Sequence, residues 1–160
     1  MLPLKAAVQA AQKAKTAFAN ASRDAVRACE AWRRNRAIRQ GYNARARELK
    51  SETQAMRERG VPREDIARRT SDFRHNERMS AREQMRKNGD DFLVKKLEQR
   101  DLKKYGNKDG PDFRQVQQKC QDELARKLGR APTRDEVLEE IIESSTRTDV
   151  WTNLKFLTVP

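Results

Sequence analysis

The first forty residues constrain the fold most strongly, because apolar or small side chains recur there at alternating steps of four and three. Such spacing is a heptad repeat, which places a single stripe along a helix and lets it pack against a second helix. The stripe consists of Leu4, Val8, Ala11, Lys15, Phe18, Ser22, Ala25, Cys29 and Trp32. Most of these side chains are small, so the helix buries little area unless it has a partner. We therefore expect one helix over residues 3–39, with a break at Gly41.

Helical periodicity continues through the rest of the chain, and strand patterns are almost absent. Loop signals at residues 60–62, 88–89 and 105–111 separate the predicted helices. The expected helices cover residues 42–59, 63–87, 90–104 and 112–128, followed by one that begins with a capping box at Thr133 and Glu136. The predicted fold class is all-α, an irregular multi-helix bundle with a long N-terminal helix. We expect residues 1–40 to be a linker or docking helix and residues 41–160 to be a separate domain, with its core in the last 70 residues.

Positive charge is concentrated at the start of the chain. The sequence has 36 Lys and Arg against 24 Asp and Glu, a net charge of +12. Residues 1–50 carry 12 basic and three acidic side chains, a net of +9, whereas residues 101–160 carry 11 of each. A localised excess of charge indicates a polyanionic partner such as nucleic acid. The alternative is a solvated helix face with no such partner.

Several classes of protein are excluded by composition. Cys29 and Cys120 form neither a CxxC metal site nor a disulfide framework, which favours a reducing compartment. A single histidine excludes metal sites that need two, and we expect no metal and no cofactor. No run of about 18 apolar residues is present, so we expect no membrane span. Ala and Gln follow Lys5 where a signal peptide would have its apolar segment, so we expect no classical signal peptide.

The first candidate site surrounds the only histidine, in the predicted helix 63–87. His75, Arg78 and Arg82 fall on one helix face, where an imidazole transfers a proton while guanidinium groups stabilise charge on a phosphate. We expect these three to be catalytic. The expected substrate-binding residues nearby are Arg69, Asp72 and Arg74. The alternative is a histidine on a charged, solvated helix.

The second candidate site follows the last predicted helix. Hydroxyl and charged side chains occupy residues 144–149, and such groups bind phosphate or ribose. We expect a catalytic role for Arg147 and substrate binding by Ser144, Ser145 and Asp149. The alternative is a helix C-terminus at which these side chains bond to the local backbone.

The third candidate is a basic cluster with aromatic residues interleaved, the combination that follows a nucleic-acid backbone and stacks on bases. Trp32 and Tyr42 are the aromatic residues, although Trp32 also belongs to the heptad stripe. The basic residues expected to bind nucleic acid are Arg33, Arg34, Arg36, Arg39, Arg45 and Arg47.

Two segments of the C-terminal half carry a family resemblance. Residues 100–113 (RDLKKYGNKDGPDF) and 139–149 (EEIIESSTRTD) resemble the ends of C-terminal toxin domains of bacterial polymorphic toxins. In that class, which type VI, Rhs and contact-dependent systems deliver, small basic toxins are often nucleases, each neutralised by an adjacent, commonly acidic immunity protein. The resemblance implies a toxin that leaves the producing cell and acts in the cytoplasm of a target cell. It does not identify the chemistry.

The resulting functional hypothesis is an all-helical toxin that acts on nucleic acid, with a cognate immunity protein as partner. One alternative is a non-enzymatic module that binds nucleic acid or protein. Another is a toxin with a different activity such as ADP-ribosylation. The heptad stripe further suggests a carrier or chaperone that docks on residues 4–32.

Overall fold

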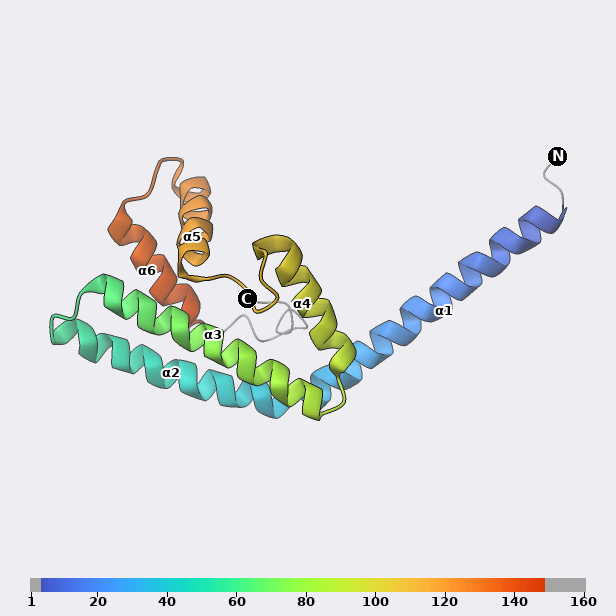
Figure 1. Cartoon of the computed structure of the whole chain (residues 1–160), viewed down its shortest axis with the longest axis horizontal. Coiled ribbons are helices and arrows are strands. Elements are labelled where there is room, and N and C mark those ends of the chain that lie inside the picture. The colour runs from blue at the N-terminus through green and yellow to red at the C-terminus, as the bar shows by residue number, and fades with distance from the viewer. Residues whose placement is uncertain (1–3, 149–160) are drawn as a thin grey trace. The chain divides into compact units, whose positions relative to one another are not determined.

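The computed structural model describes residues 4–148, which form six helices and no strand. The helices are α1 (Leu4–Arg34), α2 (Arg36–Glu58), α3 (Arg63–Lys87), α4 (Asp91–Tyr105), α5 (Phe113–Leu128) and α6 (Arg134–Ser145). Contacts divide the chain into two units between Arg34 and Asn35, whereas the sequence placed the boundary at residue 40. The first unit is α1 and the second contains α2 to α6. The all-α class and the long N-terminal helix are thus confirmed (Figure 1).

The expected helix over residues 3–39 is wrong at its end. The break falls at Asn35, not at Gly41, because the buried Asn35 side chain is held by hydrogen bonds. Its amide donates to Asp90 over 3.1 Å and its oxygen accepts from Asn88 over 2.8 Å. Gly41 stays within α2, where a Cβ atom would lie 3.0 Å from the Arg45 guanidinium.

The second unit has two hydrophobic clusters that share α3. The first joins α2, α3 and α4 and the second joins α3, α5 and α6. The first cluster contains Ile38, Tyr42, Ala46, Leu49, Phe73, Met85, Val94 and Leu97. The second contains Ile66, Ala67, Cys120, Val137, Leu138, Ile141 and Ile142. Half of the first cluster comes from α2, so a core confined to the last 70 residues was a wrong expectation.

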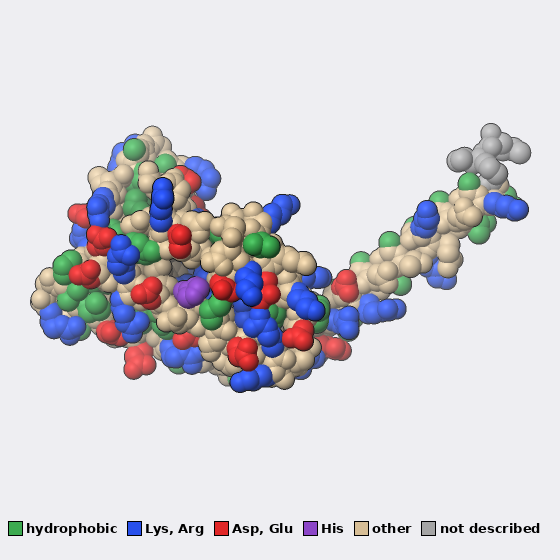
Figure 2. Space-filling view, viewed as in Figure 1, with side chains coloured by type: hydrophobic (Ala, Val, Ile, Leu, Met, Phe, Trp, Pro, Cys, Tyr) green, Lys and Arg blue, Asp and Glu red, His purple; other side chains and the backbone are tan. Residues whose placement is uncertain are grey.

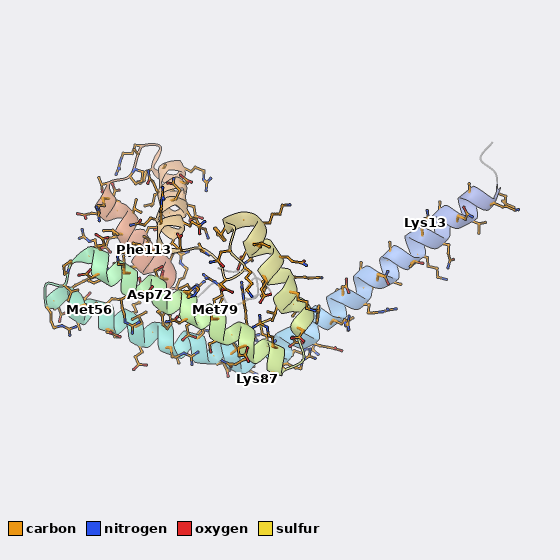
Figure 3. The ribbon with its side chains drawn as sticks, viewed as in Figure 1. Lys13, Met56, Asp72, Met79, Lys87 and Phe113 are labelled. Atoms are coloured by element: carbon orange, nitrogen blue, oxygen red, sulfur yellow. The ribbon has the colours of Figure 1, made fainter. Side chains whose placement is uncertain are left out.

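Helix α3 occupies the centre of the second unit. It runs beside α2, and α4, α5 and α6 lie on its other side (Figure 1). Figure 3 shows Met56 of α2 and Phe113 of α5 near the second cluster, against which both side chains pack. A single helix therefore presents side chains to every other helix of this unit.

Local signals fix the start of the last two helices. Asp112 and Gln115 form a capping box on α5, and Thr133 and Glu136 form the predicted one on α6. Asp90 stands at the start of α4 but makes no capping hydrogen bond, because its carboxylate accepts the Asn35 amide.

In the first unit, the stripe of α1 is exposed from Leu4 to Cys29. Leu4 and Phe18 are 82% and 76% exposed, and Val8 is exposed as well. None of the helices in residues 4–148 is both long and apolar enough to cross a membrane.

The ion pair between Arg82 of α3 and Asp101 of α4 is buried, with side chains 4% and 0% exposed. Replacing Asp101 by Ala leaves Arg82 as a buried cation and is expected to cost about 3–5 kcal/mol of unfolding free energy. Urea unfolding of the wild type and of Asp101→Ala measures this loss.

Glu52→Ala is the matched control, because Glu52 pairs with Arg69 at the surface, where ion pairs contribute about 0–1 kcal/mol. An equal loss in the two variants would show that burial of the Arg82–Asp101 pair has no energetic consequence.

Candidate functional site

A pocket of about 200 Å³ lies where α3, α5 and the end of α6 meet. The α3 wall carries Ser71, Arg74, His75 and Arg78, and the end of α6 contributes Ser144, Ser145 and Arg147. The structure therefore brings the first and second candidate sites of the sequence together. Figure 2 shows the single histidine at the surface of the second unit, in a hollow with acidic side chains on both sides.

Arg74 fixes one side of the pocket through a buried contact with Tyr42. Its guanidinium donates to the Tyr42 hydroxyl and lies 5.2 Å from the centre of that ring. The Tyr42 hydroxyl lies 3.4 Å from the carbonyl oxygen of Ser145 and 3.2 Å from that of Arg147. Burial lowers the pKa of Arg74 below its usual value. This contact ties α2 and α3 to the end of α6, so Tyr42 belongs to the core and is not an exposed base-stacking residue.

Arg78 is a largely buried cation. Its Nη1 donates to the carbonyl oxygen of Asp109 over 3.0 Å, while its buried Nε has no hydrogen-bond partner in the described part of the chain. Within that same part, no carboxylate oxygen lies within ion-pair distance of it. Burial, and then the neighbouring Arg82, lower the pKa of Arg78 to about 10. A largely buried cation that contacts a carbonyl oxygen and a neutral ring nitrogen favours an anionic ligand, because its charge is expensive to leave without a counterion.

His75 lies directly beside this cation. Its Nδ1 is 3.4 Å from Nη1 of Arg78. Because a guanidinium only donates, Nδ1 is the unprotonated ring nitrogen in this contact and Nε2 carries the hydrogen. Burial lowers the pKa of His75, and the charge of Arg78 lowers it further. The imidazole is therefore neutral at pH 7 and able to accept a proton.

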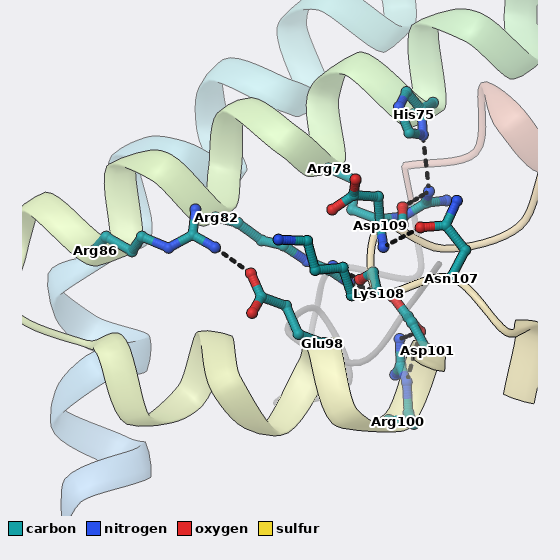
Figure 4. A network of polar contacts seen from close by, with 10 residues as sticks. All are labelled: His75, Arg78, Arg82, Arg86, Glu98, Arg100, Asp101, Asn107, Lys108 and Asp109. Atoms are coloured by element: carbon teal, nitrogen blue, oxygen red, sulfur yellow. Dashed lines mark hydrogen bonds and ion pairs between the residues drawn. The ribbon is translucent and has the colours of Figure 1, made fainter. Parts of the chain in front are cut away.

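Arg82 does not line the pocket. Its guanidinium bonds to Asp101 and donates to the carbonyl oxygen of Lys108 over 2.7 Å (Figure 4). Arg78 and Arg82 thus attach two successive carbonyl groups of the 106–111 loop to α3. The structure places Arg82 as a support for the loop that holds Arg78.

Three other predicted residues stand apart from the pocket or outside the description. Asp72 is exposed on α3 and does not line the pocket (Figure 3). Arg69 is exposed and lies 3.6 Å from Glu52. Asp149 lies outside the described residues.

The third wall of the pocket comes from α5 and was missed by sequence reasoning. It carries Val116, Lys119, Cys120 and Glu123, with Pro111 beside them. The spacing of these four residues places them on one helix face, and that was the available signal. Burial raises the pKa of the Cys120 thiol to about 11, so this group stays protonated and is a poor nucleophile at neutral pH.

The predicted basic cluster is divided between the two units. Arg33 and Arg34 end α1, and the other four members lie in α2. Arg39 is buried, and burial lowers its pKa. Arg45 donates to both carboxylate oxygens of Glu77, over 2.6 and 2.7 Å. The exposed members are Arg33, Arg34, Arg36, Arg45 and Arg47.

Comparisons with known proteins give no match: no family model, no curated protein and no solved structure is similar to this chain. In residues 4–148, no group of three or more His, Cys, Asp or Glu side chains is arranged to hold a metal ion.

The pKa of His75 is expected to lie below 6.5 and to rise in Arg78→Met, because that change removes the nearest cation. The rise is partial, since burial is the largest cause and remains. Asp72 and Asp109, which raise the pKa, and Arg82, which lowers it, are retained. An NMR titration of the single imidazole measures both values. Arg114→Met, on the exposed side of α5, is the control and should change nothing.

Gly110 is expected to control the position of Arg78. Its φ is +97°, and a Cβ atom would lie 2.5 Å from Nη1 of Arg78. Gly106 also has a positive φ, of +70°, but a Cβ atom there meets nothing within 4 Å. Both Gly→Ala variants should lose about 1–2 kcal/mol of stability, whereas only Gly110→Ala should weaken binding of inorganic phosphate in calorimetry. Equal phosphate affinity in the two variants would contradict this role.

Proposed function

We propose that the second unit binds a phosphate group of nucleic acid in this pocket and acts as a phosphodiesterase. The observation that supports this most directly is Arg78, a largely buried cation with no carboxylate partner in the described residues, which lines the pocket beside a neutral imidazole. A phosphate oxygen supplies the missing anion. Arg74 and Arg147 line the same pocket and add to its positive potential.

The proposed roles follow from these positions. Arg78, with Arg74 and Arg147, stabilises negative charge on the phosphate as the bond to the attacking oxygen forms. His75 accepts the proton of the attacking group. Ser144 and Ser145 supply hydroxyl groups at the pocket wall for oxygen atoms of the substrate.

We place this activity in a bacterial toxin, as the resemblance of residues 100–113 and 139–149 to polymorphic toxin domains implies. In this proposal the chain leaves its producer and acts in the target-cell cytoplasm, and an acidic immunity protein neutralises it. The exposed stripe of α1 then serves as the docking surface for a carrier or chaperone.

Expression of the chain in a bacterial cytoplasm is expected to arrest growth with loss of nucleic-acid integrity. His75→Ala should relieve the arrest, because removal of a general base slows such reactions by about 10²–10⁴-fold. Arg114→Ala, which removes a charge from the exposed side of α5, is the matched control and should remain toxic.

If His75→Ala arrests growth as strongly as the wild type does, the proposed site is contradicted. Arrest with intact nucleic acid would retain a toxin of another activity, such as ADP-ribosylation, and reject the nuclease.

A non-enzymatic nucleic-acid-binding module is the second candidate, favoured by the exposed arginines of α1 and α2. It predicts no turnover and an affinity that falls steeply with salt, with a slope set by the number of phosphates neutralised.

A further inference from the structure

The two long walls of the pocket differ in their charged groups, and this difference indicates how a substrate lies between them. The α3 wall carries His75 with Arg74 and Arg78, whereas the α5 wall carries Lys119 and Glu123 among apolar side chains. A phosphate bound at the guanidinium groups therefore has an imidazole on one helix and an ammonium group on another. In-line displacement at phosphorus needs a proton acceptor and a proton donor on different sides of the phosphate.

The contact between His75 and Arg78 specifies where the attacking group lies. Nδ1 accepts from Nη1 of Arg78 over 3.4 Å, so its lone pair becomes free only when a phosphate oxygen takes over that hydrogen. A hydroxyl that then donates to Nδ1 sits next to the oxygen that this guanidinium binds. In RNA the 2′-hydroxyl and the 3′-phosphate are attached to adjacent carbons of the same ribose, so the attacking hydroxyl always lies next to the phosphate. DNA lacks that hydroxyl, which is the group by which proteins distinguish the two nucleic acids.

We propose that the substrate of this pocket is RNA, cleaved by its own 2′-hydroxyl, with His75 as base and Lys119 as acid. This inference rests on the proposed nuclease function and specifies its substrate and products.

The step balances within the substrate and these two side chains. The 2′-oxygen forms a bond to phosphorus as His75 Nδ1 takes its proton, and the bond between phosphorus and the 5′-oxygen breaks. The 5′-oxygen takes a proton from the Lys119 ammonium group. The products are a 2′,3′-cyclic phosphate and a free 5′-hydroxyl, and exchange of protons with water returns His75 and Lys119 to their starting states.

The decisive experiment incubates the full chain with three labelled oligonucleotides of one sequence: all-RNA, RNA with a single 2′-deoxynucleotide, and DNA. Cleavage of RNA is expected at every accessible step except the one after the 2′-deoxynucleotide, with a 2′,3′-cyclic phosphate on the new end. DNA should remain intact. Arg114→Ala should behave as the wild type, and His75→Ala should cleave at least about a hundredfold more slowly.

The role of Lys119 is tested with a substrate in which sulfur replaces the 5′-bridging oxygen, because a thiolate leaves without being protonated. Lys119→Met should be slow on the oxygen substrate and close to the wild-type rate on the sulfur substrate. His75→Ala should be slow on both. Equal slowing of Lys119→Met on both substrates would overturn its role as the acid.

The outcomes separate the two levels of the proposal. Cleavage of DNA, or of RNA at the 2′-deoxynucleotide, would overturn the RNA inference and leave the nuclease standing. Cleavage of no oligonucleotide by a chain that arrests growth would overturn both. If RNA is cleaved but the new ends carry linear phosphates from the earliest time point, the attacking group is water and not the 2′-hydroxyl, and the RNA inference is overturned.

Discussion

The buried ion pair between Arg82 and Asp101 is the interaction on which the rest of the second unit depends. It joins α3 to α4, and the same guanidinium holds the 106–111 loop by the carbonyl oxygen of Lys108. Arg100 donates to the other oxygen of Asp101 over 2.9 and 3.1 Å, so both oxygens of this inaccessible carboxylate are satisfied. Removing Asp101 leaves the buried Arg82 cation without its counterion.

The Arg82–Asp101 pair also helps to position Arg78 in the pocket. The loop that Arg82 holds supplies the carbonyl oxygen of Asp109, which accepts from Arg78 at the pocket wall. Gly110 allows this approach, because any side chain there would displace the guanidinium. Arg74, Arg78 and Arg82 therefore follow one another at four-residue spacing on α3, each anchored by a different partner. The first of them, Arg74, is anchored by Tyr42, and the last, Arg82, is anchored by Asp101.

Sequence reasoning was most successful where structure is local. The boundaries of α3, the capping box of α6 and the glycine end of α5 follow from residues within a few positions of one another. It failed at Asn35, where partners at positions 88 and 90 decide the break. It also gave Arg82 a catalytic role that its buried partner Asp101 does not support, and it missed Lys119 and Glu123, which reach the pocket only because α5 packs on α3.

The sequence alone determined that this chain is helical, where most of its helices begin and end, and that His75 has arginines on its own helix face. These properties depend on periodicity, capping and spacing, which act over one or two turns. The tertiary structure decided which of those arginines face a pocket, since burial and pairing depend on residues from other helices. It also joined residues 71–78 to residues 144–147, because a shared wall arises only when hydrophobic faces far apart in the chain are buried together.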